Sequence, residues 1–284
     1  MTKPQVLTRR HFLFSASTFV AALAGTRTAR AGDSYSESVL AKHPVAYWRL
    51  GERQGPEAAD TSGHDHQGTY HGEVSFGQRG AIRGDPNTAI AVTPPGMYVE
   101  IPDSAEFSQP TSGRGLSVEV WMRPDLLTFP GESNDPYVMW LGKGEKEEME
   151  WGFRFYSQNS TRPNRISAYI WNADGGLGSG AYFQDELKEH EWLHVVGVFD
   201  PGSADNAGAG VSIYKNGQLR GSPATSKGAL YGTYDIRPRK GTAPVRLGTR
   251  DLRSFLTGGL DEVAIYPLKL TAVEVQENYR RAMK

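Results

Sequence analysis

Short segments in which apolar and polar residues alternate recur along most of this chain, and this pattern most restricts what it can fold into. In LSVEVWMRP, Leu116, Val118 and Val120 alternate with Ser117 and Glu119. Because residues two apart lie on the same face of a β-strand, each such segment predicts a strand with one face toward a core. Glycine (33 residues) and proline (17 residues) punctuate these segments, as expected for many short strands joined by turns.

Alternation of the same kind predicts further strands along the chain. These segments are AYWRL, MYVEI, WGFRFYS, RISAYIWN, EWLHVVGVF, GVSIYKNGQLRG, PVRLGT and GGLDEVAIY. Asn216-Gly217 lies inside one of them, and both residue types tolerate the positive φ that a type I′ hairpin turn requires. The sequence therefore predicts about a dozen strands, with a tight hairpin at Asn216-Gly217.

Helical patterning is confined to the ends of the folded part. Residues 36–42 predict a short helical turn, and LTAVEVQENYRRAMK predicts a longer helix. Thr271 and Glu274 have the spacing of a capping box, and Leu270 and Val275 that of a hydrophobic staple. Many strands and one terminal helix predict an all-β fold, an antiparallel two-sheet β-sandwich with a short C-terminal helix, and exclude a doubly wound α/β fold.

The first residues have the composition of an export signal. Arg9 and Arg10 precede a weakly apolar stretch at residues 12–25, and Ala29-Arg30-Ala31 matches an A-x-A cleavage pattern. The sequence thus predicts a twin-arginine signal peptide at residues 1–31, a single domain at residues 32–284, and export to the periplasm or beyond the cell. The chain has no cysteine, which excludes a disulfide framework and a lipoprotein anchor.

Charge and hydropathy exclude two classes of partner. Residues 1–31 hold five of the 31 basic residues and none of the 32 acidic ones, so the predicted mature chain has 26 basic residues against 32 acidic and a net charge of −6. This sign argues against nucleic acid or an anionic bilayer as the main partner. No run of eighteen apolar residues occurs, so we expect no membrane span in the mature protein.

Six motifs, taken in order, resemble a known family. They are AYWRLGE, DTSGHDHQG, LSVEVWMRP, EWLHVVGVFD, IYKNGQL and FLTGGLDEVAIYPLKLTAVEVQENY. In this order they resemble the laminin-G-like, concanavalin A-like jelly-roll domains of bacterial exported proteins, from Tyr35 to Arg281. The resemblance implies two curved antiparallel sheets packed face to face, with the first and last strands as neighbours. Such domains include lectins, protein-binding modules and some polysaccharide-cleaving enzymes, so the fold leaves the function open.

The resemblance also implies a calcium-binding turn. Asp60 and Ser62 match the family's loop, and Asp261 in GGLDE is the implied second carboxylate. The positions that depart from the family pattern are His64, Asp65, His66 and Gln67. We therefore expect either a structural calcium held by Asp60 and Asp261, or a turn closed by the hydrogen bonds of Asp60 alone.

Histidines suggest two other sites, both weaker. His64 and His66 have the spacing of a chelating pair, with His71 or Asp60 as a third zinc ligand. No further histidine or cysteine provides a fourth ligand, which favours a polar turn. His194 lies on an apolar strand face, where a hydrogen-bonded core histidine is commoner than a general base.

Two carboxylates offer an enzymatic alternative. Glu148 and Glu150 are two residues apart, as are the acids of laminarinase-like jelly-roll hydrolases, which they resemble. Lys146 and Met149 stand where that pattern has further acids. This departure favours a charged loop over a catalytic pair.

Aromatic residues carry the stronger functional signal. If Ile166, Ala168 and Ile170 are buried, Tyr169 and Trp171 turn to the opposite face, where Arg154 and Tyr156 of a neighbouring strand would join them. Aromatic rings stack on sugar C–H faces while arginine binds hydroxyl groups. These four residues predict an exported, non-catalytic carbohydrate-binding module for a cell-envelope or other glycan. The alternatives are a polysaccharide-degrading enzyme using Glu148 and Glu150, or a protein-binding adhesion module.

Overall fold

The computed structural model describes residues 1–2, 34–108, 115–129, 135–145, 148–171, 178–202, 210–222, 229–230 and 239–284. Contacts divide the chain into two units, Met1–Arg30 and Ala31–Lys284, and the strands and helices belong to the second. Nearly all of the predicted export signal lies outside the described residues. In the described ranges, no helix has the length and apolar character needed to cross a bilayer.

One sheet, called sheet A here, has eight strands. Its order is β14-β13-β12-β7-β17-β5-β4, with β1 also paired to β17. The strands are β1 (Ala46–Trp48), β4 (Ser75–Arg79), β5 (Thr88–Val92), β7 (Leu116–Pro124), β12 (Leu193–Asp200), β13 (Gly210–Lys215), β14 (Gln218–Gly221) and β17 (Gly258–Tyr266). The pairing of β1 with β17 confirms that the first and last strands are neighbours.

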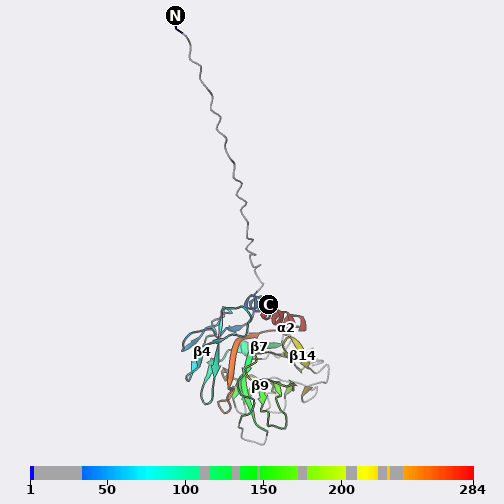
Figure 1. Ribbon diagram of the computed structural model, residues 1–284. Helices are drawn as coiled ribbons and strands as arrows, with labels where there is room; N and C mark the ends of the chain where they lie inside the picture. The colour runs from blue at the N-terminus through cyan, green and yellow to red at the C-terminus, as the bar shows by residue number, and fades with distance from the viewer. Residues whose placement is uncertain are drawn as a thin grey trace. The chain divides into compact units, whose positions relative to one another are not determined.

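The other sheet, sheet B, has nine strands in the order β15-β11-β10-β9-β8-β16-β6-β3-β2. They are β2 (Glu57–Ala58), β3 (Gly68–His71), β6 (Tyr98–Ile101), β8 (Tyr137–Glu145), β9 (Glu148–Tyr156), β10 (Ile166–Ile170), β11 (Ser179–Phe183), β15 (Ala229–Leu230) and β16 (Val245–Leu247). Every strand pair in both sheets is antiparallel. The predicted antiparallel sandwich is therefore confirmed (Figure 1).

The main core lies between the two sheets and follows the alternation in the sequence. Val118 and Val120 of sheet A and Ile166 and Ala168 of sheet B belong to one cluster of fully buried residues. The Asn216-Gly217 hairpin joins β13 to β14, and both residues have positive φ (51° and 75°). These features match the sequence prediction because a type I′ turn follows the twist of the strands it joins.

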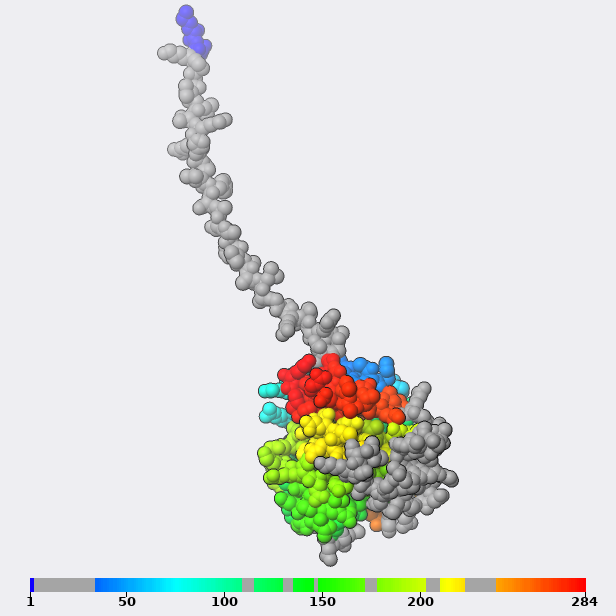
Figure 2. Space-filling view, turned by 90° about the vertical axis from the view of Figure 1, so that its right-hand side faces the viewer, coloured from blue at the N-terminus to red at the C-terminus, as the bar shows by residue number. Residues whose placement is uncertain are grey.

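Two helices cover the outer face of sheet A. Both α1 (Tyr35–Leu40) and α2 (Ala272–Ala282) begin with a capping box, at Ser34 and at Thr271 respectively. Their apolar side chains form a second buried cluster with Trp121 of β7. Figure 2 shows the adjoining surfaces of α1 (blue) and α2 (red) above β13 and β14 (yellow). A short 3₁₀ helix, η1 (Ala105–Phe107), completes the described helices.

Candidate functional site

The four residues predicted to bind sugar lie on the outer face of sheet B. Phe155 of β9 is paired with Ile166 of β10, and both belong to the core between the sheets. Arg154 is paired with Ser167 on the opposite face, and Gly152 with Tyr169. Since side chains alternate along each strand, Tyr156 and Trp171 project to this same outer face.

Arginine and aromatic side chains are in direct contact on this face. The guanidinium carbon of Arg154 lies 4.2 Å from the ring centre of Tyr137, 4.8 Å from that of Tyr169 and 5.7 Å from that of Tyr156. Arg154 Nη1 donates a hydrogen bond of 2.8 Å to the Tyr156 hydroxyl. The rings of Tyr169 and Trp171 stack with their centres 5.4 Å apart. The sequence thus identified four side chains that the fold brings together.

The exposure of these rings differs from the sequence expectation. The sequence places Tyr156, Tyr169 and Trp171 on the outer face of the sheet. In the structure, however, Tyr156 is only 1% exposed and Tyr169 only 3%. Cation–π contacts explain part of this, because Arg154 lies over both rings and covers their faces. Arg154 and Trp171 are half-buried and Tyr137 is 38% exposed, so these three form the accessible part of the face.

A further arginine, which the sequence reasoning missed, lies on the same face. The Arg250 side chain is 4% exposed, and its guanidinium carbon lies 5.4 Å from the ring centre of Trp171. Its Nη2 pairs with Asp251 at 2.7 Å, whereas Nε and Nη1 have no hydrogen-bond partner among the described residues. Burial lowers the pKa of Arg250, against the opposing charge of Asp251. Each buried unpartnered N–H costs about 1–3 kcal/mol.

Glycines make room for these side chains. A row across sheet B joins Arg246, Gly142, Gly152, Tyr169 and Gly180 by strand pairing. A Cβ at Gly142 or Gly152 would lie 3.1 or 3.2 Å from Arg250 Cδ, and one at Gly180 would lie 2.8 Å from the Tyr169 ring. The approach to Tyr169 is too close for a Cβ and those to Arg250 are tight, so glycine at these positions gives both side chains room. Nothing in the linear pattern reveals this, because Arg250 comes from the segment after β16.

The two residues of the predicted alternative catalytic pair, Glu148 and Glu150, lie in different surroundings. Glu150 is 1% exposed and forms an ion pair with the fully buried Lys143, which also pairs with Asp103 at 2.8 Å. Ser108 Oγ and the Gly241 N–H donate to Glu150 at 2.8 and 2.9 Å. Glu148 is exposed at the start of β9. Glu150 therefore works as the acceptor of a buried ion-pair network, a role that the buried Lys143 creates and the sequence reasoning missed.

Asp60 closes the turn of the DTSGHDHQG segment. Its Oδ1 accepts hydrogen bonds from the N–H groups of Tyr47 (2.8 Å) and Ser62 (2.9 Å). Its Oδ2 accepts from the Ser62 hydroxyl (2.8 Å) and the His66 N–H (3.0 Å). Asp65 at the turn has a positive φ of 62°, which aspartate tolerates where the family pattern has glycine. Donors surround Asp60, which is the environment of a capped turn.

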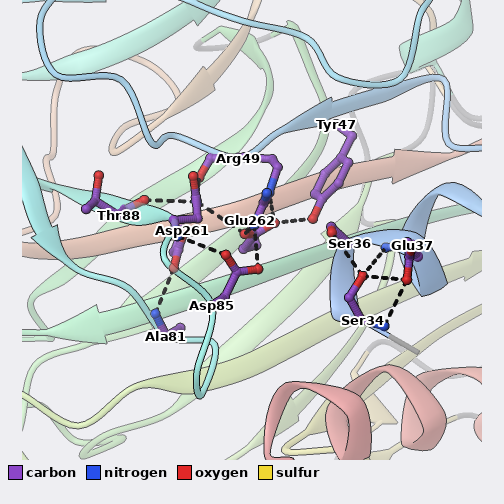
Figure 3. Close-up of polar contacts among 11 residues, drawn as sticks. Ser34, Ser36, Glu37, Tyr47, Arg49, Ala81, Asp85, Thr88, Asp261 and Glu262 are labelled. Atoms are coloured by element: carbon purple, nitrogen blue, oxygen red, sulfur yellow. Dashed lines mark hydrogen bonds and ion pairs between the residues drawn. The ribbon is translucent and has the colours of Figure 1, made fainter. Parts of the chain in front are cut away.

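The implied second calcium ligand, Asp261, has a different environment (Figure 3). Its Oδ2 accepts from the Ala81 N–H at 2.7 Å, while Oδ1 is buried without a hydrogen-bond partner. Burial and the neighbouring Glu262 charge raise the pKa of Asp261 well above its usual range. In the ranges described, no group of three or more histidine, cysteine, aspartate or glutamate side chains is arranged to hold a metal ion. The described contacts of Asp60 and Asp261 are thus hydrogen bonds within the protein.

Beside Asp261, an arginine supplies the positive charge for a carboxylate cluster. Arg49 Nη2 forms ion pairs with Glu262 at 2.7 Å and with Asp85 at 2.8 Å. The Tyr47 hydroxyl also donates to Glu262. Figure 3 shows that Tyr47, on β1, and Arg49, in the segment after it, both point toward Glu262. Arg49 thus neutralises acids near the place where the sequence suggested a cation.

The histidines of the same segment lie in separate contacts. His66 Nε2 lies 3.0 Å from Glu106, and its ring centre lies 4.6 Å from that of Phe107. His64 stacks at 6.4 Å from His66, whereas His71 stacks on Tyr98 at 4.5 Å. These contacts are those of a polar turn packed on its neighbours.

His194 is fully buried and belongs to a network centred on Glu119. Its Nε2 lies 2.7 Å from Glu119 Oε1. Glu119 also accepts hydrogen bonds from Tyr35 of α1 (3.0 Å), Asn278 of α2 (2.9 Å) and Tyr266 of β17 (2.7 Å). Burial raises the pKa of Glu119, but the hydrogen bond and charge of His194 outweigh it, so the pKa is lowered. The predicted core role of His194 is confirmed, and one carboxylate ties both helices to sheet A.

The known proteins that this chain resembles share its fold. Residues 95–276 match the family model described as concanavalin A-like lectin/glucanases superfamily. No curated protein matches. Three similar solved structures are binding domains of botulinum neurotoxins, each with a TM-score of 0.58. The serotype G domain is 13% identical, and the match covers 84% of this chain and 50% of that chain. The DC domains in complex with SialylT and with rat synaptotagmin II are 10% and 11% identical, and each match covers 86% of this chain and 52% of that chain. The chain spans about half the length of these proteins, and at this identity the likeness concerns the fold.

Proposed function

The chain belongs to the concanavalin A-like lectin/glucanases superfamily, and from this premise we propose that it binds carbohydrate, without cleaving it, at the outer face of sheet B. The observation that carries the proposal is the contact of Arg154 with three tyrosine rings beside a half-buried Trp171. The Trp171 ring can stack on the C–H groups of a sugar, and the guanidinium of Arg154, held by the tyrosine rings, can bind its hydroxyl groups.

The four residues predicted from the sequence then have different roles. Trp171 and Arg154 reach the accessible surface, so they contact the sugar, joined by the exposed Tyr137. Tyr156 and Tyr169 are covered by Arg154 and hold its guanidinium in place. The neurotoxin DC binding domain in complex with SialylT, whose fold is similar, supports the proposal.

The test is a glycan array probed with the chain and with Trp171→Ala. We expect binding to at least one glycan and its loss in the variant, with no reducing ends or unsaturated products released. Trp192→Ala is a matched control, because Trp192 is also half-buried under an arginine, Arg123 at 5.2 Å, but stands next to β12 of sheet A. An array without any signal contradicts the proposal and favours a protein partner. Released products that Glu150→Gln abolishes would favour an enzyme.

We also propose export by the twin-arginine route, which the sequence of residues 1–31 supports. The test is the location of the full chain in a bacterial host. Replacing Arg9 and Arg10 by lysine should retain the protein in the cytoplasm, with its N-terminus uncleaved. Export that does not depend on these two residues contradicts this proposal.

We propose separately a structural calcium held by Asp60 and Asp261 together, supported by the loop motif of the sequence. An ion bound only to the native state raises the melting temperature. Calcium is therefore expected to raise it and a chelator to reverse the rise, with Asp60→Asn insensitive to both. If neither treatment changes the melting temperature, the native protein does not bind calcium and the proposal is wrong.

A further inference from the structure

We propose that Arg250 and Arg154 together receive an anionic group of the bound glycan, a carboxylate or a sulfate ester. This inference rests on the proposed carbohydrate function and narrows it to acidic sugars. It is based on the charge balance of the face, on the unpartnered N–H groups of Arg250 and on the glycines that seat this residue.

The charge balance at this part of sheet B is positive. Arg250 has one carboxylate partner, Asp251. In the part of the chain that the structure describes, Arg154 forms no ion pair and instead contacts tyrosine rings and the sulfur of Met139. The whole chain has a formal net charge of −1, so this local excess is not a general property of the surface. An acidic ligand that binds here is therefore selected by the site and not by overall charge.

The neighbouring arginine behaves differently. Arg246, in the same row across sheet B, is paired with both Glu100 (2.8 Å) and Glu145 (2.9 Å) and donates a further bond to the Arg250 carbonyl. Its donors are satisfied by the protein. Arg250 has two nitrogen atoms without a partner in the same surroundings. An oxyanion is the ligand chemistry that satisfies guanidinium N–H groups, and it does so with charge-assisted hydrogen bonds.

The route to Arg250 starts from the accessible residues. The unpartnered nitrogen atoms are covered in this structure, so the guanidinium has to turn to meet a ligand. It lies beside Trp171, which is half-buried, and within electrostatic range of Arg154 and Tyr137. Gly142 and Gly152 beneath it carry no side chain to block the turn. A sugar ring on Trp171 would thus present its acidic substituent between the two arginines.

The experiment compares binding of polygalacturonate, dextran sulfate and neutral dextran, and of a mixed glycan array, to the chain and to Arg250→Met. We expect the acidic glycans to bind and the variant to lose about 10- to 100-fold in affinity, the range for a hydrogen bond to a charged group. Arg250→Met leaves the half-buried Asp251 without its ion pair, so its melting temperature is measured first and binding is compared at a temperature where the variant is folded. Arg154→Met provides a second variant should the first fold poorly.

Arg165→Met is the matched control. Arg165 also stacks on a tyrosine near this sheet, at 3.9 Å from the Tyr182 ring centre, but its Nε and Nη2 already donate to Gln184. Its loss should leave binding unchanged. Preference for polygalacturonate identifies a carboxylate, and preference for dextran sulfate identifies a sulfate ester.

Two outcomes overturn the inference while leaving carbohydrate binding intact. One is binding restricted to neutral glycans. The other is acidic-glycan binding that Arg250→Met and Arg154→Met reduce no more than Arg165→Met does. An array with no bound glycan refutes the proposed function itself, and the two failures are therefore distinguishable.

Discussion

The outer faces of the two sheets differ in how completely their buried charged groups are paired within the protein. On sheet A the buried charges are carboxylates, and both oxygens of Glu119 and of Glu262 accept hydrogen bonds from protein groups. On sheet B, among the residues that the structure describes, the two arginines around Trp171 have a single carboxylate partner, and two Arg250 nitrogens have no hydrogen-bond partner. A network complete within the protein stabilises the fold, whereas an incomplete one leaves an interaction for a ligand.

The two kinds of unpartnered group also differ chemically. Asp261 on sheet A has a buried oxygen without a partner, but a carboxyl group can accept a proton and become neutral. Arginine remains charged in proteins and cannot lose its proton at any ordinary pH. The unmet charge on sheet A can thus be removed by protonation. Arg250 on sheet B keeps its charge, so its Nε and Nη1 can be satisfied by an acidic ligand.

The largest predicted effect concerns Glu119. Glu119→Ala leaves His194, Tyr35, Tyr266 and Asn278 without their shared acceptor, and removing one member of a buried charged network costs about 3–5 kcal/mol. The free energy of unfolding, measured with urea, should fall by this amount. Glu148→Ala, at an exposed position, should change it by less than about 0.5 kcal/mol. Equal effects of the two substitutions contradict the role assigned to Glu119.

The same carboxylate predicts the acid sensitivity of the helix-covered face. Because the folded-state pKa of Glu119 is lowered, its stabilising contribution is fully present above the pKa of the unfolded chain and is lost as pH falls through the folded value. We therefore expect the stability gap between the native chain and Glu119→Ala to narrow on acidification. Urea unfolding at a series of acidic pH values measures the gap, and a gap that widens has the wrong sign.

A smaller effect is predicted for Glu150 on sheet B, whose carboxylate belongs to the Lys143 network while its carbonyl accepts the Trp171 N–H. Glu150→Gln keeps an acceptor for Ser108 and Gly241 but leaves Lys143 with Asp103 alone, so we expect a loss of about 1–3 kcal/mol. Glycan binding should be unchanged, since the Trp171 N–H donates to the Glu150 carbonyl, which the substitution keeps, and not to the carboxylate that it replaces. A stable variant that has lost a hydrolytic activity would instead identify Glu150 as a catalytic residue.

Sequence reasoning succeeded where the information is local or periodic. Alternation identified both faces of β7 and β10, the capping box identified α2, and Asn216-Gly217 identified a hairpin. It also placed Arg154, Tyr156, Tyr169 and Trp171 on one face. Each conclusion follows from the spacing of residues within one or two neighbouring strands.

Sequence reasoning failed where side chains meet from distant segments. Arg250 reaches β8 and β9 from beyond β16, and Lys143 neutralises Glu150 across a hairpin. The covering of Tyr156 and Tyr169 depends on the path of one long side chain, that of Arg154. Alternation assigns a residue to a face of a sheet, but it does not say what else covers that face.

The smallest predicted effect concerns Asp261 and tests the difference between the faces most directly. Because its folded-state pKa is raised, Asp261 favours folding while it is protonated at low pH, and this advantage is lost as pH rises. Asp261→Asn keeps an acceptor for the Ala81 N–H and cannot ionise. At neutral pH it should stabilise the protein by about 1 kcal/mol, as replacement of a costly buried charge often does.

Urea unfolding between pH 5 and pH 8 measures this effect. The advantage of Asp261→Asn over the native chain must grow as pH rises, since only the native residue loses stability by ionising. Glu262→Gln is the comparison, because Glu262 already has Arg49 and Tyr47 as partners and its replacement should destabilise the protein. Destabilisation by Asp261→Asn at every pH would mean that the carboxylate form is needed there. In that case sheet A, like sheet B, would contain an unmatched charge, here a negative one, and this result would support the calcium proposal.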